Sequence, residues 1–539
     1  MESKKNTKDI KQQKKSYKLN LTSTDTINQC YVYITNFLFA LRNDQELMFK
    51  IIQKAPINPE TEKCFSLFIM NNFYENILSP SYIEDELLAL IERSLNYEIN
   101  LLNSKFDYNN FLDKTATGFL LGGLISKNDV KSYFNMLLKS VIEKMENKNK
   151  EWNFSVNKIA NYVSIKKQKE KEMKNKKFQN KTNNNNNFDN SIDFSTLKIN
   201  IKEQQEEDNF FYDTYISDLK IKDLKKKMKD LNEDMKIYIQ KQIDESENNE
   251  DIYSNTRFLD LVYNSSEPNE VLSYYQKDFM NCINIIKDIF NLLNQNIHLV
   301  PFSVKCICKI ISLLLKRKFK DISKIEINTF IGKFFFEKLF NPIIRRPDYN
   351  ALITSFIISK QTRNNIDYIC EIIKNLVSGK FFRGIKDVNY TPFNCFFLHD
   401  SMPLAIEFFD KIINVNLPPY IEKLINDPEN DNYYYNYFEE NKNEFALQKS
   451  ICFTVKDFLC LFNIVKENKE FFLQTSTCKD LKEEKIKNNR RMFGLTIDKL
   501  SIKIHGERLK THLEKEENEK VINFYLNQKL YIIKNLQSY

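Results

Sequence analysis

The chain has a persistent helical periodicity and few residues that would interrupt it. Of its 539 residues only 8 are glycine and 12 are proline. In residues 27–52 most apolar side chains recur at intervals of three and four: Ile27, Val32, Ile34, Leu38, Leu41, Leu47 and Ile51. This spacing is typical of one buried face of an α-helix. Segments 82–102, 268–297, 301–321 and 401–415 show a similar period, and glycine-containing hairpin signals are missing. The sequence therefore predicts an all-α protein.

Composition narrows the functional classes. Hydrophobic residues make up 42% and aromatic residues 13%, enough for a large core. The formal net charge of +8, from 80 basic and 72 acidic residues, is too small for this length to indicate nucleic-acid binding. The sequence has no stretch of 18 uncharged apolar residues, so it predicts no transmembrane segment. The ten cysteines lack metal-ligand spacing, so we expect reduced thiols in a cytosolic protein, no metal and no cofactor.

A change of composition divides the chain. Residues 166–187, KKQKEKEMKNKKFQNKTNNNNN, are polar and low in complexity, and we expect them to be disordered. The predicted organisation is a basic arm (1–25), a helical domain in two parts (26–165 and 265–475), an insertion between them (166–264) and a charged extension (476–539). Within that extension, residues 519–536 have a helix-like pattern.

The insertion also contains a heptad-like apolar stripe. It consists of Ile221, Leu224, Met228, Leu231, Met235 and Tyr238. Nearly three heptads predict a helix that packs against the body of the protein or on itself, or alternatively against a coiled-coil partner.

Three of the eight glycines lie in the single segment TGFLLGGLISK, residues 117–127. A pair of glycines between helical runs is typical of a tight turn, and it also permits close backbone approach. We therefore expect a loop at this point.

Residues 331–348, IGKFFFEKLFNPIIRRPD, resemble the central motif of Ras GTPase-activating (RasGAP) domains. The residues in register with that motif are Phe334, Asn341, Pro342, Ile344 and Pro347. Segments 294–319 and 363–384 are similar to the flanking helices of the IQGAP group, and Gly379 is expected to end the second. The resemblance extends over about 27–165 and 265–475, and it implies a RasGAP-like multi-helical fold.

The same resemblance implies that the glycine segment, residues 117–127, corresponds to the finger loop of RasGAP domains. Catalytically active members of the family carry an arginine in this loop. The matching residues are Phe119, Leu120, Leu121, Gly122 and Gly123, so Leu121 occupies the arginine position. That arginine stabilises charge on the transferring phosphoryl group and accounts for about 10³–10⁵ in rate. Leucine has neither the charge nor the forked donors.

Two further departures follow from the resemblance. Lys338 matches a second arginine that braces the finger loop, and lysine keeps its charge but not its bidentate hydrogen bonding. Glu371 stands where the family's helix normally presents a lysine to the GTPase. The three departures together imply that the chain is not an enzyme.

A partner-binding groove is expected around the motif helices. Its candidate residues are Lys338, Asn341, Pro342, Arg345, Arg346, Glu371, Lys374 and Arg383. The arginines around these helices, Arg363 among them, either line a basic groove for an acidic GTPase surface or pair with acids such as Asp348 and Asp367.

We therefore predict a catalytically inactive RasGAP-like adaptor or cytoskeletal scaffold. The alternative is an effector that binds a GTP-loaded small GTPase without stimulating hydrolysis, and the third reading is an active GTPase-activating protein. The expected partners are proteins, either a small GTPase or cytoskeletal filament proteins, and not nucleic acid. The expected location is the cytoplasm, with a cytoskeletal or ciliary association.

Overall fold

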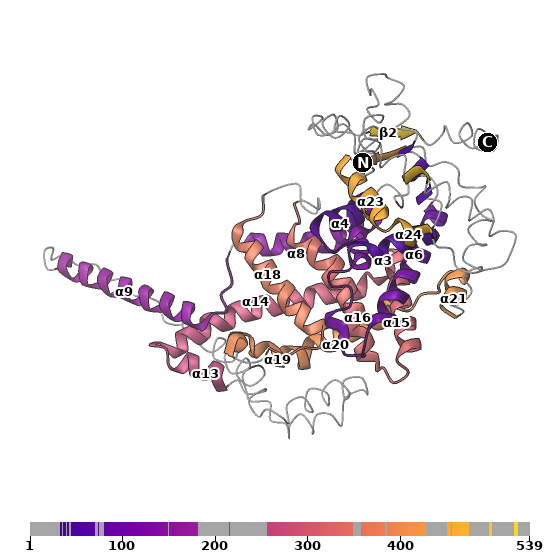
Figure 1. Cartoon of the computed structure of the whole chain (residues 1–539). Helices are drawn as coiled ribbons and strands as arrows, with labels where there is room; N and C mark the ends of the chain where they lie inside the picture. Colours follow the sequence, from indigo (N-terminus) through magenta and orange to yellow (C-terminus); the bar gives the residue numbers. More distant parts are fainter. Residues whose placement is uncertain are drawn as a thin grey trace, which may run out of the picture. The chain divides into compact units, whose positions relative to one another are not determined.

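The computed structural model describes the chain between residues 33 and 525, with gaps (Figure 1). The described residues are 33–34, 36–38, 40–41, 45–70, 74, 80–148, 150–181, 215, 256–348, 357–382, 385–426, 450–453, 455–473, 495–497 and 522–525. They form two compact units, and each unit is made of segments that are not consecutive in the sequence. Unit 1 comprises 1–97, 114–126 and 419–539, and unit 2 comprises 98–113 and 127–418.

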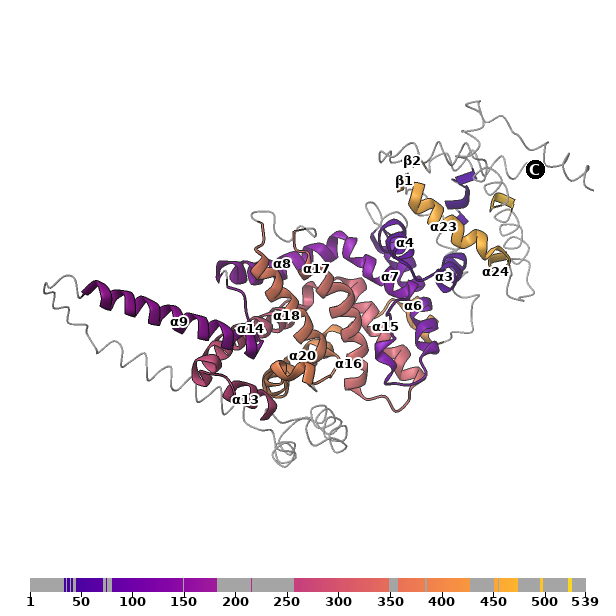
Figure 2. The same cartoon turned by 60° about the vertical axis from the view of Figure 1, so that its left-hand side comes forward.

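Unit 2 is built around one long helix, α14 (Pro268–Gln295). It contacts α8 (Asn128–Lys148), α9 (Val156–Lys181), α13 (Thr256–Tyr263), α18 (Lys360–Val377) and α20 (Met402–Ile412). The remaining elements are η2 (Asp107–Asn109), η7 (Ile297–Leu299), α15 (Phe302–Lys318), α16 (Lys324–Gly332), η8 (Lys333–Phe340), α17 (Asn341–Arg345), η9 (Ile385–Tyr390), α19 (Pro392–Phe396) and η10 (Phe397–Ser401). Figure 2 shows α16, α18 and α20 side by side.

The core of unit 2 is rich in aromatic rings. Phe335, Phe336 and Phe408 are buried and mutually in contact, with ring centroids 4.9–5.9 Å apart. Edge-on and tilted pairs of this kind add to the stabilisation from burying apolar area. The many phenylalanines therefore form the core that holds the motif helix η8 in place.

Unit 1 also consists mainly of helices. These are α3 (Gln45–Lys54), α4 (Pro59–Lys63), η1 (Cys64–Ile69), most of α6 (Pro80–Leu101), α7 (Ala116–Gly122), η3 (Gly123–Ser126), α21 (Pro419–Asn426), α23 (Val455–Glu467) and α24 (Lys469–Leu473). The α7 segment contacts η1, α4 and α3. Phe37 of this unit meets Phe458 and Phe462 edge-on, which ties the early part of the chain to α23.

The prediction of an all-α fold is confirmed, with one small addition. Strand β1 (Ser450–Phe453) pairs antiparallel with β2 (Ile522–Tyr525), with Ser450 opposite Tyr525 and Phe453 opposite Ile522. The helix expected over 519–536 is therefore wrong at residues 522–525. Isoleucine, phenylalanine and tyrosine favour a strand once a partner strand is present.

The predicted disorder is also wrong at the start of the insertion, because α9 continues to Lys181. Its sequence there is rich in lysine, glutamate and glutamine, which are good helix formers. Lys166 and Glu170 pair across one helical turn, and Lys167 pairs with Glu267 and Glu270. The heptad-like stripe at 221–238 lies outside the described residues, and the five-part domain organisation stays a prediction.

Within the described residues, no helix is both long enough and apolar enough to cross a membrane.

Candidate functional site

The segment expected to be the finger loop is helical. Helix α7 begins after Thr115, whose Oγ1 accepts a hydrogen bond from the Gly118 N–H at 3.0 Å, and the helix runs into the 3₁₀ turn η3. This cap satisfies one of the amide groups left open at a helix start. Leu120, Leu121 and Leu124 are each 0% exposed. The expectation of a loop is wrong because these leucines bury one face of a short helix.

The two adjacent glycines have different surroundings. A Cβ on Gly123 would lie 2.5 Å from the carbonyl oxygen and 2.8 Å from the Cα of Ser66, which belongs to η1. A Cβ on Gly122 would meet nothing within 4 Å. Close backbone approach therefore accounts for glycine at position 123.

The motif residues Phe334, Asn341, Pro342 and Ile344 lie on one continuous helical run made of α16, η8 and α17, and Pro347 lies in the turn that follows. The η8 stretch is π-helical and is followed by Asn341 and Pro342. Proline has no amide N–H and its ring crowds the carbonyl four residues earlier, so normal α-helical bonding is interrupted here. Asn341 is buried and its Oδ1 has no hydrogen-bond partner, whereas Pro342 is exposed.

Two of the arginines around the predicted groove, Arg345 and Arg363, are engaged with acids. Arg345 Nε lies 3.2 Å from Asp367 Oδ1. Arg363 donates from both terminal nitrogens to the two carboxylate oxygens of Asp348, at 3.3 and 3.1 Å. The sequence analysis left two options for the arginines, a basic groove or pairing with acids. For these two arginines, pairing with acids is confirmed. Arg346 is exposed, and Arg383 lies outside the described residues.

Four lysines gather where η8 meets the end of α18. This lysine cluster consists of Lys333, Lys338, Lys374 and Lys380. Burial lowers the pKa of Lys333, and the neighbouring Lys338 and Lys374 lower it further, against an opposing effect of Glu337 and Asp113. Burial and Lys374 also lower the pKa of Lys380. The cluster therefore brings four lysines close together, with Glu337 and Asp113 nearby.

Two members of the lysine cluster hold the segment before α7. Lys333, which is buried, donates to the backbone carbonyl of Asn109. Lys380 donates to Asn109 Oδ1 at 2.9 Å and lies over the Tyr108 ring, 5.2 Å from its centroid. Sequence reasoning identified Lys338 and Lys374 but missed Lys333 and Lys380. Their flanking phenylalanines gave the available signal, since a lysine among core aromatics needs a fixed acceptor.

Of the remaining groove residues, Lys338 is half-buried, and Glu371 and Lys374 are exposed on α18. Glu371 precedes Lys374 by three positions, so the two side chains share one helix face. The acid at position 371 therefore lies beside the lysine cluster.

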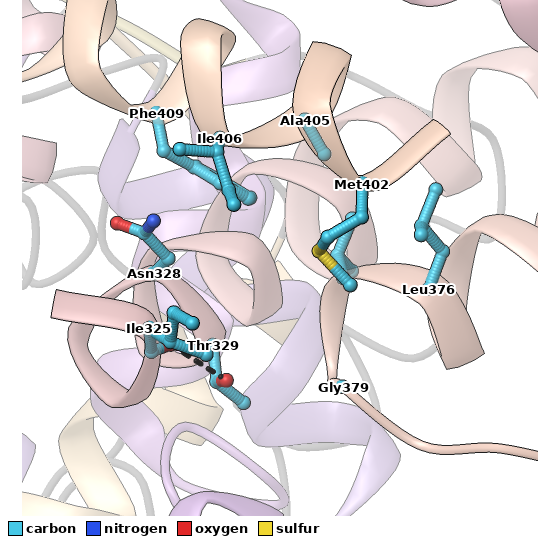
Figure 3. Close-up of a pocket in the computed structure, with 10 residues that line it drawn as sticks. Ile325, Asn328, Thr329, Leu376, Gly379, Met402, Ala405, Ile406 and Phe409 are labelled. Carbon is cyan, nitrogen blue, oxygen red and sulfur yellow. Dashed lines mark hydrogen bonds between the residues drawn. The ribbon is translucent and has the colours of Figure 1, made fainter. Parts of the chain in front are cut away.

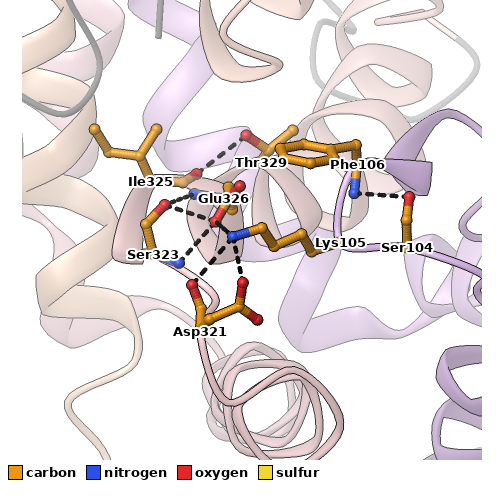
Figure 4. Close-up of polar contacts among 8 residues, drawn as sticks. All are labelled: Ser104, Lys105, Phe106, Asp321, Ser323, Ile325, Glu326 and Thr329. Atoms are coloured by element: carbon orange, nitrogen blue, oxygen red, sulfur yellow. Dashed lines mark hydrogen bonds and ion pairs between the residues drawn. The ribbon is translucent and has the colours of Figure 1, made fainter. Parts of the chain in front are cut away.

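A second set of contacts fixes the same 98–113 segment (Figure 4). Lys105 Nζ lies 2.9 Å from Asp321 Oδ2 and 3.6 Å from Glu326 Oε2. The hydrogen bond to Asp321 raises the pKa of Lys105 and lowers that of Asp321. Glu326 also completes a capping box with Ser323 at the start of α16.

A narrow apolar pocket lies between α16, α20 and the end of α18 (Figure 3). Asn328 points toward Ile406 and Phe409 in this view, and neither amide atom of Asn328 has a hydrogen-bond partner. The free space is ≈ 10 Å³, about enough for one water molecule. An organic ligand does not fit this pocket. No group of three potential metal-ligating side chains occurs among the residues that the structure describes.

The fold and this site define a class: an all-helical domain whose aromatic motif helix continues through Asn-Pro and packs beside a second, charged helix. The chain belongs to the RasGAP family, described as GTPase-activator protein for Ras-like GTPase, whose model matches residues 89–378, more than half of the chain.

The chain is also similar to individual members of this group. It is 22% identical over 118 residues to the Ras GTPase-activating-like protein IQGAP2 of Homo sapiens, covering 21% of this chain and 8% of that protein. It is 25% identical over 150 residues to the Ras GTPase-activating-like protein gapA of Dictyostelium discoideum, covering 28% of this chain and 17% of that protein. The chain thus matches only a small part of the length of these relatives.

Proposed function

We propose that this RasGAP-family chain does not stimulate GTP hydrolysis and acts as an adaptor or scaffold. The observation that carries the proposal is Leu121, a fully buried hydrocarbon side chain within α7. The resemblance to the family puts the catalytic arginine at this position. Without that arginine, a loss of about 10³–10⁵ in stimulated rate is expected.

The lysine cluster supports a second candidate function, which is binding of a GTP-loaded Ras-like GTPase as an effector. Lys338 and Lys374 present positive charge that suits an acidic protein surface. The family description and the names of both relatives refer to Ras GTPases. Filament proteins as partners, and a cytoplasmic location with cytoskeletal or ciliary association, belong to the scaffold proposal.

The test is single-turnover GTP hydrolysis by a panel of Ras-like GTPases, with and without the full chain. The expected rate is the intrinsic rate of each GTPase. A rise of about 10³ or more for any of them would overturn the non-catalytic proposal. Binding to GTP-analogue-loaded and GDP-loaded forms then separates the candidates. Selective binding to the GTP form supports an effector, whereas co-sedimentation with actin filaments or microtubules and no GTPase binding supports a scaffold.

Leu121→Arg is a poor test of the non-catalytic proposal, because the guanidinium group would enter the core at this buried position. Gly122→Arg is the better variant, since a Cβ at that position meets nothing within 4 Å. Gly122→Ala is its matched control.

A further inference from the structure

Tyr215 belongs to the predicted insertion, yet its side chain is buried in unit 2. It is only 2% exposed. Its ring lies 5.2 Å from that of Phe279 on α14, at an interplanar angle of 57°. Its hydroxyl donates a hydrogen bond of 2.6 Å to Asp400 Oδ2 on η10. A residue distant in sequence from both elements thus makes an apolar and a polar contact with them.

Asp400, which accepts this hydrogen bond, also forms an ion pair. Lys287 Nζ, also from α14, lies 3.0 Å from the same Asp400 Oδ2. The ammonium group is 5.9 Å from the centroid of the Phe396 ring. One oxygen of Asp400 therefore accepts the Tyr215 hydroxyl and also contacts the Lys287 ammonium group. We call the site formed by Phe279, Lys287 and Asp400 at the Tyr215 side chain the tyrosine slot.

The slot matches the chemistry of tyrosine in particular. Phe279 provides an aromatic contact for the ring, and Asp400 provides an acceptor at the end of the ring. Burial and the contact with Asp400 raise the pKa of Tyr215, so its hydroxyl stays protonated and remains a donor. A phenylalanine would leave the carboxylate without this donor, and a phosphorylated tyrosine would bring negative charge against it.

We propose that the tyrosine slot is an intramolecular docking site, through which Tyr215 tethers the insertion to the RasGAP-family body. The occupant is the chain's own Tyr215, as the contacts above place it. The tether operates whether or not the chain binds a GTPase, so it stands apart from the proposed function.

The experiment removes the Tyr215 side chain from the chain and supplies a tyrosine on a separate peptide. Tyr215→Ala in the full chain empties the slot, and a fluorescent peptide of residues 205–225 is titrated into it. The peptide is expected to bind this variant at least about tenfold more tightly than it binds the unaltered chain, whose slot is held by a tethered competitor.

Peptide variants test the role of the hydroxyl. Phenylalanine at position 215 is expected to weaken binding by about tenfold or more, because a hydrogen bond to a charged group is lost. A phosphotyrosine peptide is expected not to bind. Phenylalanine at Tyr212 is the matched control and is expected to leave affinity unchanged. Equal affinity of the 215 and 212 variants would overturn the proposal.

A second measurement does not depend on the alanine variant folding well. Limited proteolysis within residues 182–255 is expected to be several-fold faster in Asp400→Asn than in the unaltered chain, while Asp288→Asn on α14 serves as the control. Cleavage at the same rate in all three proteins would contradict the tether.

Discussion

Gly122 and Gly123 are neighbours in sequence, but only one of them needs to be glycine for steric reasons. A Cβ on Gly123 would meet the backbone of Ser66, and backbone cannot move aside as a flexible side chain can. Gly122 faces open space. The pair therefore offers a test of packing in which the two substitutions are chemically identical.

Gly123→Ala is expected to lower the free energy of unfolding by about 1–3 kcal/mol, the usual cost of forcing an extra methyl into a packed site. Gly122→Ala is expected to leave stability unchanged or to raise it by up to about 1 kcal/mol, since alanine favours helix. Urea unfolding of both variants checks this, and equal effects at the two positions would contradict the structure.

Lys318 concentrates three hydrogen bonds on the end of α6. Its ammonium group donates to the carbonyl oxygens of Ile99, Asn100 and Leu102 at 2.7, 2.7 and 2.6 Å. These are carbonyls that a helix C-terminus leaves open, and a cation there also suits the helix dipole. One side chain of α15 thereby fixes where the 98–113 segment leaves the helix.

Lys318→Met keeps the aliphatic stem and removes the donors. This variant is expected to lower the free energy of unfolding by about 1–2 kcal/mol. The loss lies toward the lower end of the range for hydrogen bonds to a charged group, because the site is partly exposed. Lys316→Met on the same helix removes an exposed lysine and is expected to change stability by less than about 0.5 kcal/mol. Thermal unfolding of the two variants measures the difference, and similar losses in both would refute the role given to Lys318.

At the scale of elements, α18 is defined at both ends by specific caps. At its start, Ser359 Oγ accepts from the Thr362 N–H, and Glu146 of α8 accepts from Ser359 N–H and Oγ–H at 3.2 and 3.0 Å. At its end, Gly379 has φ 64°, with Gly379 N–H bonded to Leu376 O and Lys380 N–H bonded to Asn375 O. This is a Schellman motif. It confirms the predicted role of Gly379.

The cap from Glu146 predicts a pH dependence. Burial acts to raise the pKa of Glu146, but hydrogen bonds from Thr362 and Ser359 outweigh it and lower the pKa overall. A lowered folded-state pKa stabilises the protein above the unfolded-state value, about 4.3 for glutamate, and this contribution is lost as the pH falls through the folded-state pKa.

Glu146→Gln is therefore expected to destabilise the protein at pH 7 and to have a smaller effect at about pH 3.5. Glu143→Gln on the same helix controls for a general change of charge. Urea unfolding at both pH values supplies the four comparisons. A Glu146→Gln effect that is the same at both pH values would rule out the ionised cap.

Elements with strong local signals could be predicted from the sequence, whereas contacts between distant segments could not. The apolar period gave α14 and α15, and Gly379 marked the end of α18. Helix α7 was mistaken for a loop because the demand on Gly123 comes from Ser66, outside the local pattern. Within the lysine cluster, sequence reasoning named Lys338 and Lys374 as groove residues but not Lys333 and Lys380, because these two are fixed by Asn109, more than 200 residues away.

At the scale of the whole molecule, the family match and the two units divide the chain differently. The match spans residues 89–378, whereas unit 1 contains 89–97 and 114–126 from within it, together with residues before 89 and after 418. Leu121, the position that the resemblance equates with the finger arginine, therefore belongs to unit 1, and the lysine cluster belongs to unit 2. A test of GTPase binding can address the lysine cluster without altering α7.

Lys338→Glu combined with Lys374→Glu reverses charge at the two cluster members that do not hold Asn109. If a GTP-loaded Ras-like GTPase binds this surface, its Kd is expected to rise by about tenfold or more, and binding by the unaltered chain is expected to weaken with increasing salt. Lys169→Glu with Lys277→Glu, on exposed positions of α9 and α14, makes the same change in net charge and is expected to leave the Kd nearly unchanged. Equal weakening by both pairs would mean that overall charge, and not this cluster, attracts the GTPase. Binding that survives the 338/374 pair would place the GTPase on another surface of the chain.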